Sequence, residues 1–207
     1  MGNSKGFDSV AVYYDWLVRL VFGTSMSRAQ TVFLGAIKDC TNVLVLGGGT
    51  SPWMTDFLKN RPGCRVVYIE ASPRMLNLSK EMASFDKRID FRLGTEELLS
   101  DGDQFDAIVT FCYLDLFSEE ELQRVIHTIT RFAKHRAIWL ATDFVEGRSW
   151  HTAMLRIMYI FFKITTGLPN HQLPDWNELL EKNRVKKIDS RLFYGEFISS
   201  GLYVFQG

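Results

Sequence analysis

Two apolar runs, each ending at a distinctive turn, most constrain the fold of this chain. Val43–Leu46 enters the glycine triplet Gly47–Gly49, and Val66–Ile69 ends in an acid, Glu70. A short apolar run that leads into a glycine turn is typical of a parallel strand buried on both faces. Glycine lets the backbone approach a ligand closely, and an acid at the tip of the next strand can accept hydrogen bonds from ribose hydroxyls. The two runs therefore predict a doubly wound α/β domain that holds a nucleoside.

The rest of the chain continues this alternation of strands and helices. Further strands are expected at Ile89–Leu93, Phe105–Phe111 and Ala137–Ala141. Val185–Leu192 and Phe197–Phe205 are expected to form an antiparallel pair at the sheet edge. We therefore expect a Rossmann-like, mostly parallel sheet of seven strands, with helices on both faces, an antiparallel edge strand and a helical cap.

One domain is expected, because 207 residues of which 46% are apolar can supply a single sizeable core. Within residues 1–207 we expect four parts in chain order. These are a helical lid at 1–37 that is broken at Gly23, a cofactor-binding core at 38–147, a helical cap at 148–184, and terminal strands at 185–207.

Three helix starts can be predicted from their capping residues. Ser51-Pro52 and Ser72-Pro73 each place a capping hydroxyl before a proline that suits the first helical position. Ser118 is followed three residues later by Glu121, the spacing of a capping box.

The charge balance bears on the partners of the chain. Lysine plus arginine and aspartate plus glutamate number 24 each, so the formal net charge is zero. This argues against a nucleic-acid binder that works by bulk charge, and weak repulsion between copies is compatible with a homodimer. The most apolar stretch, Ile157–Phe162, is bounded by Arg156 and Lys163 and is too short for stable membrane insertion.

The three cysteines indicate a reducing environment. Cys40, Cys64 and Cys112 form no paired motif, and no histidine or cysteine lies near them at a ligand spacing. We therefore expect reduced thiols, a cytoplasmic location and no metal site.

The glycine triplet leaves other classes open. An NAD site of the G-x-G-x-x-G type requires a small residue where this chain has Pro52, and a clear catalytic Tyr-x-x-x-Lys is missing, so an NAD-dependent oxidoreductase is the less favoured reading. A tight glycine turn that binds nothing is the structural alternative.

Residues Val43–Ser51 resemble the first motif of class I S-adenosylmethionine-dependent methyltransferases, usually written V-L-D-x-G-x-G-T-G. Two glycines and Thr50 match, whereas the acid of the family falls on Val45 and its last glycine on Ser51. The resemblance implies S-adenosylmethionine as the cofactor.

Two later segments extend the resemblance. Glu70–Leu76 is similar to the D-x-S-x-x-M-L segment of the family, in which the acid binds both ribose hydroxyls and Met75 would pack on adenine. Gly94–Leu98 is similar to the D-A-E-x-L segment, although Gly94 replaces its first acid, so Thr95 or Glu96 would contact the adenine amino group.

The N-terminal segment resembles the methyltransferases of ubiquinone and menaquinone synthesis. The resemblance implies that Tyr14 touches the sulfonium region and that Arg28 reaches the methionine carboxylate. Taken together, the cofactor-binding residues that it implies are Tyr14, Arg28, Gly47, Gly48, Gly49, Glu70, Ala71, Met75, Thr95, Glu96 and Phe111.

The expected reaction is in-line methyl transfer to a small apolar or aromatic acceptor, in which the protein mainly aligns the reactants. Asp115 and Asp143 follow strands, and His151 opens the cap helix. Of these, His151 and Asp115 are the predicted catalytic residues, because either could help to deprotonate the acceptor. The alternative is an inactive methyltransferase-like protein that binds S-adenosylmethionine or S-adenosylhomocysteine, as the changes at Val45, Ser51 and Gly94 suggest.

Overall fold

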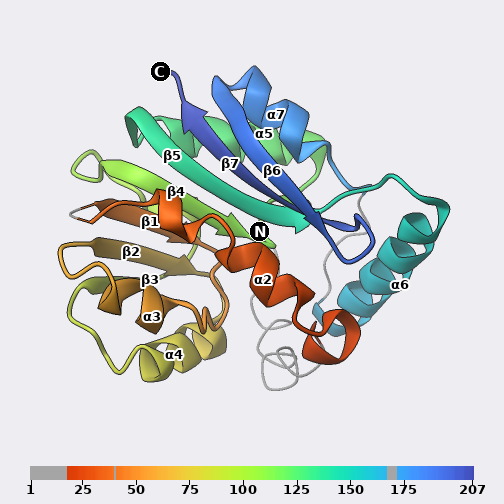
Figure 1. The fold of residues 1–207 in the computed structure, drawn as a ribbon, viewed down its shortest axis with the longest axis horizontal. Coiled ribbons are helices and arrows are strands. Elements are labelled where there is room, and N and C mark those ends of the chain that lie inside the picture. Colours follow the sequence, from red (N-terminus) through yellow and green to blue (C-terminus); the bar gives the residue numbers. More distant parts are fainter. Residues whose placement is uncertain (1–17, 40, 167–171) are drawn as a thin grey trace.

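The computed structural model describes residues 18–39, 41–166 and 172–207, and these contain a seven-stranded sheet (Figure 1). The strand order is β3-β2-β1-β4-β5-β7-β6. Strands β1 to β5 are parallel to one another, and β7 runs antiparallel to both β5 and β6, so the antiparallel strand lies one place inside the edge. The predicted fold class is thereby confirmed. The strands are β1 (Asn42–Leu46), β2 (Arg65–Glu70), β3 (Ile89–Leu93), β4 (Phe105–Phe111), β5 (Ala133–Phe144), β6 (Val185–Phe193) and β7 (Ile198–Phe205).

Helices connect and cover these strands. The α-helices are α2 (Ser25–Thr31), α3 (Met54–Lys59), α4 (Pro73–Met82), α5 (Glu119–Thr130), α6 (Ser149–Thr166) and α7 (Trp176–Lys182), and the short 3-10 helices are η1 (Leu34–Ala36), η2 (Glu96–Leu98) and η3 (Leu114–Leu116). The predicted break at Gly23 is confirmed, because this residue has φ +56 and separates α2 from the helical residues 18–22.

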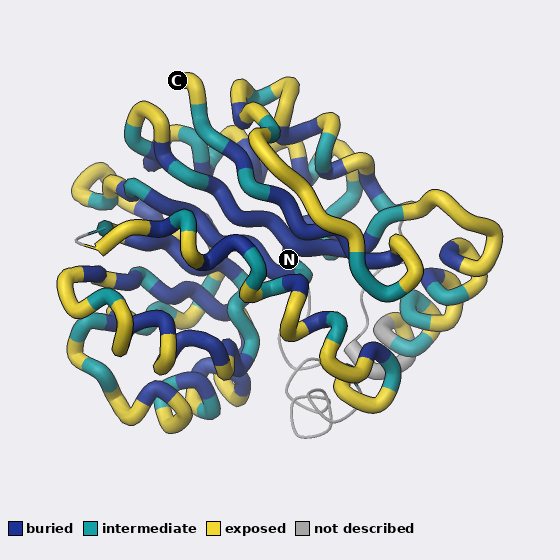
Figure 2. The backbone as a smooth tube through the Cα atoms, viewed as in Figure 1, coloured by how far each residue is buried: buried dark blue, intermediate teal, exposed yellow. Residues whose placement is uncertain are grey.

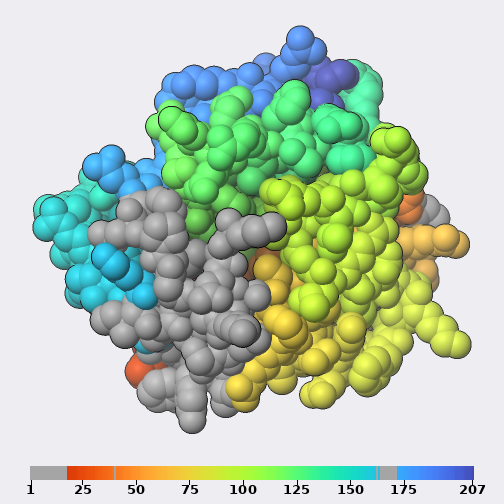
Figure 3. Space-filling model, turned by 180° about the vertical axis from the view of Figure 1, so that it is seen from behind, coloured from red at the N-terminus to blue at the C-terminus, as the bar shows by residue number. Residues whose placement is uncertain are grey.

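The apolar core lies on both faces of the sheet. Leu44 and Leu46 of β1 pack in one cluster with residues of α5 and α7. Val43 and Val45 point to the opposite face and pack with residues of α3, α4 and η1. Figure 2 shows the strands as the most deeply buried layer, and Figure 3 shows α5, in green, across the rear face. Burial on both faces explains why β1 is a continuous apolar run.

Two of the three predicted helix starts are confirmed. The Ser72 side chain accepts a hydrogen bond from the backbone of Met75, and Ser118 forms the complete capping box with Glu121. The prediction for Ser51 is wrong, because α3 begins at Met54 with no side-chain cap. The Ser51 hydroxyl instead donates to the carbonyl of Gly48 at 2.6 Å, inside the glycine turn.

Strand β5 is longer than the predicted Ala137–Ala141. Its pairing with β4 passes from Phe105↔Ala133 to Ala107↔Ile138, so an irregularity containing Arg136, at φ +63, interrupts the ladder. The polar residues of this bulge hide the first part of the strand from a pattern based on apolar runs.

The loops that follow β1, β2, β3 and β4 meet at one edge of the sheet, because parallel strands end together. Helix α6 lies beyond this carboxyl edge (Figure 1). Among the described helices, none has both the length and the hydropathy needed to cross a bilayer.

Candidate active site at the carboxyl edge of the sheet

The glycine turn after β1 adopts a conformation that favours glycine. Gly47 and Gly49 have φ +61 and φ +59, and the N–H of Gly47 donates to the carbonyl of Ile69 at 3.0 Å. A Cβ atom on Gly47 would lie 2.4 Å from the ring of Tyr113, whereas a Cβ atom on Gly49 would meet no atom of the described residues within 4 Å. The turn is therefore packed at Gly47 and open at Gly49, where a ligand can approach the backbone.

Glu70 is joined directly to this turn. One carboxylate oxygen of Glu70 accepts the N–H of Gly49 at 3.1 Å, and the other accepts the N–H of Ser72 at 2.8 Å. The residue is 9% exposed. The acid that was predicted to bind ribose is thus held beside the open part of the glycine turn.

A group of hydroxyls that sequence reasoning missed supports the turn from beneath. The Tyr68 hydroxyl lies 2.7 Å from the carbonyl of Gly49 and 3.1 Å from the hydroxyl of Ser79, which also donates to that carbonyl. Gly48 must lack a side chain because a Cβ atom there would lie 2.5 Å from the Tyr68 hydroxyl. The available signal was that Tyr68 stands two residues before Glu70 and so shares its face of β2.

Tyr113 connects two loops of the site and was also missed. Its hydroxyl donates to a carboxylate oxygen of Glu96 at 2.6 Å, and both residues are buried. Burial raises the pKa of Tyr113 well above its ordinary value, and the negative charges of Glu96 and Glu70 act in the same direction. Tyr113 therefore stays protonated and donates to the predicted adenine-binding acid.

Asp143, at the end of β5, shapes the turn after β4. One of its carboxylate oxygens accepts the backbone N–H groups of Tyr113 at 3.1 Å, Leu114 at 2.9 Å and Asp115 at 3.3 Å. The other oxygen accepts the N–H of Phe144 at 2.9 Å. A carboxylate with four such donors is a positioning group, and it fixes where the Asp115 side chain begins.

Asp115 and Tyr159 carry buried polar atoms that lack partners. Within the described residues, the Asp115 Oδ1 atom and the Tyr159 hydroxyl are the buried side-chain oxygens with no hydrogen bond. Burial raises the pKa of Asp115 well above its ordinary value, and the charge of Asp143 adds to this effect. Burial also raises the pKa of Asp143, to about 6. The two carboxyls therefore share a proton near neutral pH.

His151 is bound to the backbone at both ring nitrogens. Its Nε2 atom lies 3.1 Å from the carbonyl of Gly195, and its Nδ1 atom accepts the N–H of Arg148 at 3.3 Å. These partners assign the tautomer with the proton on Nε2. The buried ring thus joins the start of α6 to the turn between β6 and β7, and a catalytic role for it stays a prediction.

The other predicted cofactor residues lie in several environments. Met75 is buried at the start of α4, whereas Ala71, Thr95 and Arg28 are exposed. Phe111 is buried on the face covered by α3, with its ring centroid 5.6 Å from that of Trp53. Tyr14 lies outside the described residues.

The three departures from the family motif have separate structural settings. Val45 is an apolar core residue. Ser51 has φ +39 and keeps a conformation in which the family has glycine. At Gly94 a Cβ atom would lie 2.6 Å from the Leu98 side chain, so the family acid does not fit here without a shift.

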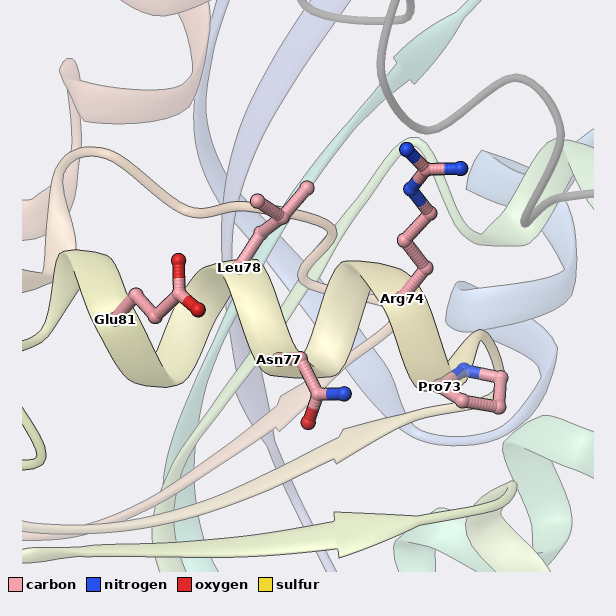
Figure 4. A pocket seen from close by; sticks show the side chains of 5 residues that line it. All are labelled: Pro73, Arg74, Asn77, Leu78 and Glu81. Carbon is pink, nitrogen blue, oxygen red and sulfur yellow. The ribbon is translucent and has the colours of Figure 1, made fainter.

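A surface depression of about 530 Å³ lies elsewhere, along α4. It is lined by Pro73, Arg74, Asn77, Leu78 and Glu81, and Figure 4 shows Arg74 and Asn77 pointing away from each other. Because one helix supplies every lining residue, it is a surface feature and not the nucleoside site. The described ranges contain no cluster of three or more His, Cys, Asp or Glu side chains that could hold a metal ion.

Comparisons with known proteins identify this arrangement. Residues 43–136 match the family model described as a methyltransferase domain. No curated protein sequence matches the chain. The fold is similar to that of the N-methyltransferase NodS from Bradyrhizobium japonicum WM9 in complex with S-adenosylhomocysteine, with a TM-score of 0.66, 12% identity, and coverage of 89% of this chain and 85% of NodS.

Two further solved structures share the fold. An O-methyltransferase family protein from Burkholderia thailandensis gives a TM-score of 0.70 at 13% identity, over 99% of this chain and 60% of that one. An O-methyltransferase family 2 protein from Planctomyces limnophilus DSM 3776, in complex with apigenin, gives a TM-score of 0.63 at 14% identity, over 79% of this chain and 50% of that one. The chain thus spans about half to three fifths of the length of these two proteins.

The sheet order and these likenesses define a class I methyltransferase fold. Residues 43–136 are similar to a methyltransferase domain, and the fold is similar to that of an N-methyltransferase solved with S-adenosylhomocysteine.

Proposed function

We propose that this chain binds S-adenosylmethionine across Gly47–Gly49 and transfers its methyl group to a small apolar or aromatic acceptor. The observation that carries the proposal is the bond between the Glu70 carboxylate and the N–H of Gly49 at the carboxyl edge. This bond places a ribose-binding acid beside backbone that is open to a ligand. The family match over residues 43–136 supports the same reading.

The residues of the site fit such a cofactor. Glu70 would accept the ribose hydroxyls, Met75 would pack on adenine, and the Tyr113–Glu96 pair would close the adenosine side of the site. When bound, S-adenosylmethionine supplies the electrophilic methyl carbon. The chain's own residues then have to hold the acceptor in line with that carbon and exclude water.

Of the two predicted catalytic residues, Asp115 is the better supported. Its Oδ1 atom is free of hydrogen bonds with any described residue, whereas both nitrogens of His151 are engaged with the backbone. We therefore place the acceptor at the ends of β4 and β5, beneath α6. The apigenin complex of the Planctomyces protein supports an aromatic acceptor by analogy of fold alone.

We further propose that the protein is a member of the ubiquinone and menaquinone group, that it is cytoplasmic, that it forms a homodimer and that it has no nucleic-acid partner. An inactive protein that binds S-adenosylmethionine or S-adenosylhomocysteine is the second candidate, and the altered residues Val45, Ser51 and Gly94 favour it. Turnover of any acceptor would exclude this second candidate.

Calorimetric titration tests the proposal. S-adenosylmethionine, S-adenosylhomocysteine and NAD are titrated into the wild type, into Glu70→Gln, and into Asp101→Asn as a control. Asp101 is an exposed acid in the loop before β4, at the opposite edge of the sheet. We expect the wild type and the control to bind the first two ligands and not NAD, and Glu70→Gln to bind them more weakly. Absence of binding to the wild type would refute the proposal.

A further inference from the structure

Two buried side-chain oxygens, supplied by different elements, have no hydrogen-bond partner among the residues that the structure describes. Asp115 is 7% exposed and comes from η3, and Tyr159 comes from α6. Tyr159 packs in the same apolar cluster as Cys112, which starts the turn that leads to Asp115, and Phe144, which follows Asp143. Burial raises the pKa of Tyr159, and the charges of Asp115 and Asp143 act in the same direction. Buried polar atoms in folded proteins nearly always have a partner, so two orphans in one place indicate a missing ligand.

We propose that Asp115 and Tyr159 form the polar end of the acceptor site and bind the neutral hydroxyl group of an apolar aromatic compound. This inference rests on the proposed function, because it names the class of molecule that would receive the methyl group. The two residues touch the acceptor directly, whereas Asp143 acts only by positioning Asp115.

The hydrogen-bonding capacity of the two side chains selects a hydroxyl. Because Asp143 accepts four backbone N–H donors, it holds the negative charge, and the shared proton lies on Asp115. The carboxylic acid can direct that proton to Asp143 and leave Oδ1 as an acceptor, while the Tyr159 hydroxyl can donate. A hydroxyl group, with one donor and two acceptor positions, satisfies both at once.

The side chains that surround Tyr159 indicate the chemical character of the rest of the acceptor. Tyr159 and Cys112 pack against an apolar cluster that includes Met26 of α2, Phe144 of β5 and Leu155 of α6. The side chains around Tyr159 are therefore mainly apolar. A carboxylate on the acceptor would be repelled, because the pair already holds one negative charge and, within the described part of the chain, its hydrogen-bond donors are backbone N–H groups and not cations.

The test uses one carbon skeleton with three substituents. 1-Naphthol, 1-methoxynaphthalene and 1-naphthoate are titrated calorimetrically into the wild-type protein loaded with S-adenosylhomocysteine, and also into the protein without it. The variants are Asp115→Leu, which removes the acceptor oxygen, and Asp115→Asn, whose amide keeps a carbonyl and a donor to Asp143. Tyr159→Phe removes the second partner, and Tyr194→Phe is its control within the same apolar cluster.

We expect the wild type to bind 1-naphthol and to discriminate against the ether and the carboxylate. The dissociation constant of 1-naphthol should rise about tenfold in Asp115→Leu and in Tyr159→Phe, and change less than about twofold in Asp115→Asn and Tyr194→Phe. If Asp115→Leu does not fold, the affinity of Tyr159→Phe for 1-naphthol still tests the inference. The inference is overturned by wild-type protein that does not bind 1-naphthol, by unchanged binding in Tyr159→Phe, or by equal binding of the ether or the carboxylate.

The two titrations separate the failure of this inference from the failure of the proposed function. Binding of S-adenosylhomocysteine without a response to 1-naphthol overturns the acceptor site alone. A response to 1-naphthol that depends on Tyr159, in protein that does not bind S-adenosylhomocysteine, supports the hydroxyl site and contradicts the methyltransferase proposal.

Discussion

The hydroxyl of Tyr113 donates a 2.6 Å hydrogen bond to Glu96, and this bond ties the turn after β4 to the turn after β3. The ring of Tyr113 also covers Gly47, since a Cβ atom there would lie 2.4 Å from the ring. Three loops of the carboxyl edge therefore depend on one side chain for their relative positions.

Tyr113→Phe should lower the free energy of unfolding by about 1.5–3 kcal/mol, because it leaves the buried Glu96 carboxylate without this donor. Glu96→Gln should cost less, since its amide oxygen can still accept. Urea denaturation of the two variants checks this order. A Tyr113→Phe protein as stable as the wild type would show that the bond contributes nothing.

Gly47→Ala and Gly49→Ala form a matched pair, because the two glycines share nearly the same φ but have different surroundings. Both substitutions should lower the free energy of unfolding by about 1 kcal/mol, because alanine is strained in the left-handed backbone conformation. Gly47→Ala should lower the free energy of unfolding by about 1–3 kcal/mol more, because its Cβ atom would overlap the ring of Tyr113. Thermal and urea unfolding measure the difference, and equal losses would contradict the packing described.

Gly49→Ala should nevertheless bind S-adenosylmethionine more weakly, because its new methyl group projects into the open side of the turn. Calorimetry on the folded variant measures this. An unchanged dissociation constant would show that the cofactor does not bind beside Gly49.

Glu70→Ala should weaken binding of S-adenosylmethionine by about 1–3 kcal/mol, the typical cost of leaving paired hydroxyls unmatched. The substitution also removes acceptors for the N–H groups of Gly49 and Ser72. Circular dichroism and thermal unfolding must therefore show a folded protein before titration. Unchanged affinity would place the ribose elsewhere.

Asp115→Asn should change how stability depends on pH. The folded-state pKa of Asp115 is raised, so its protonated form stabilises the fold fully below the ordinary pKa of about 4, and this contribution is lost as pH rises toward the folded-state value. Asparagine cannot lose that proton. The free energy of unfolding of the variant, relative to the wild type, should rise by about 1–3 kcal/mol between about pH 4 and pH 8. Urea denaturation at several pH values checks this, and a constant difference would contradict the shared proton.

Local signals explain which features could be predicted from the sequence. The bounds of β3 and β4 were predicted without error, because the alternating segment Ile89–Leu93 and the mainly apolar segment Phe105–Phe111 ended at turns. The place of Glu70 at a strand end predicted a ligand-binding acid there, and its carboxylate accepts the N–H of Gly49. The Ser51 cap was wrong because the hydroxyl is used inside the glycine turn, an outcome that depends on a backbone conformation that no local pattern specifies.

The missed residues depend on contacts between distant parts of the chain. Tyr113 meets Asp143 and Glu96 only because β4 pairs with β5 in one register and because η2 returns beside η3. Tyr159 comes from α6, which follows the last parallel strand, and its hydroxyl has no hydrogen-bond partner among the described residues. Apolar periodicity predicts the strands and helices but not which polar atoms their packing will leave without partners.

The direction of β7 has a practical consequence for measurement. Because this strand runs against its neighbours, Phe205 pairs with Val185 at the edge where β6 begins, away from the glycine turn. A tether attached after Phe205 would therefore leave the molecule on the side opposite the binding loops. Protein immobilised in this way would present those loops to the flowing solution, so a surface-based sensor could record association and dissociation rates without the anchor competing for the site.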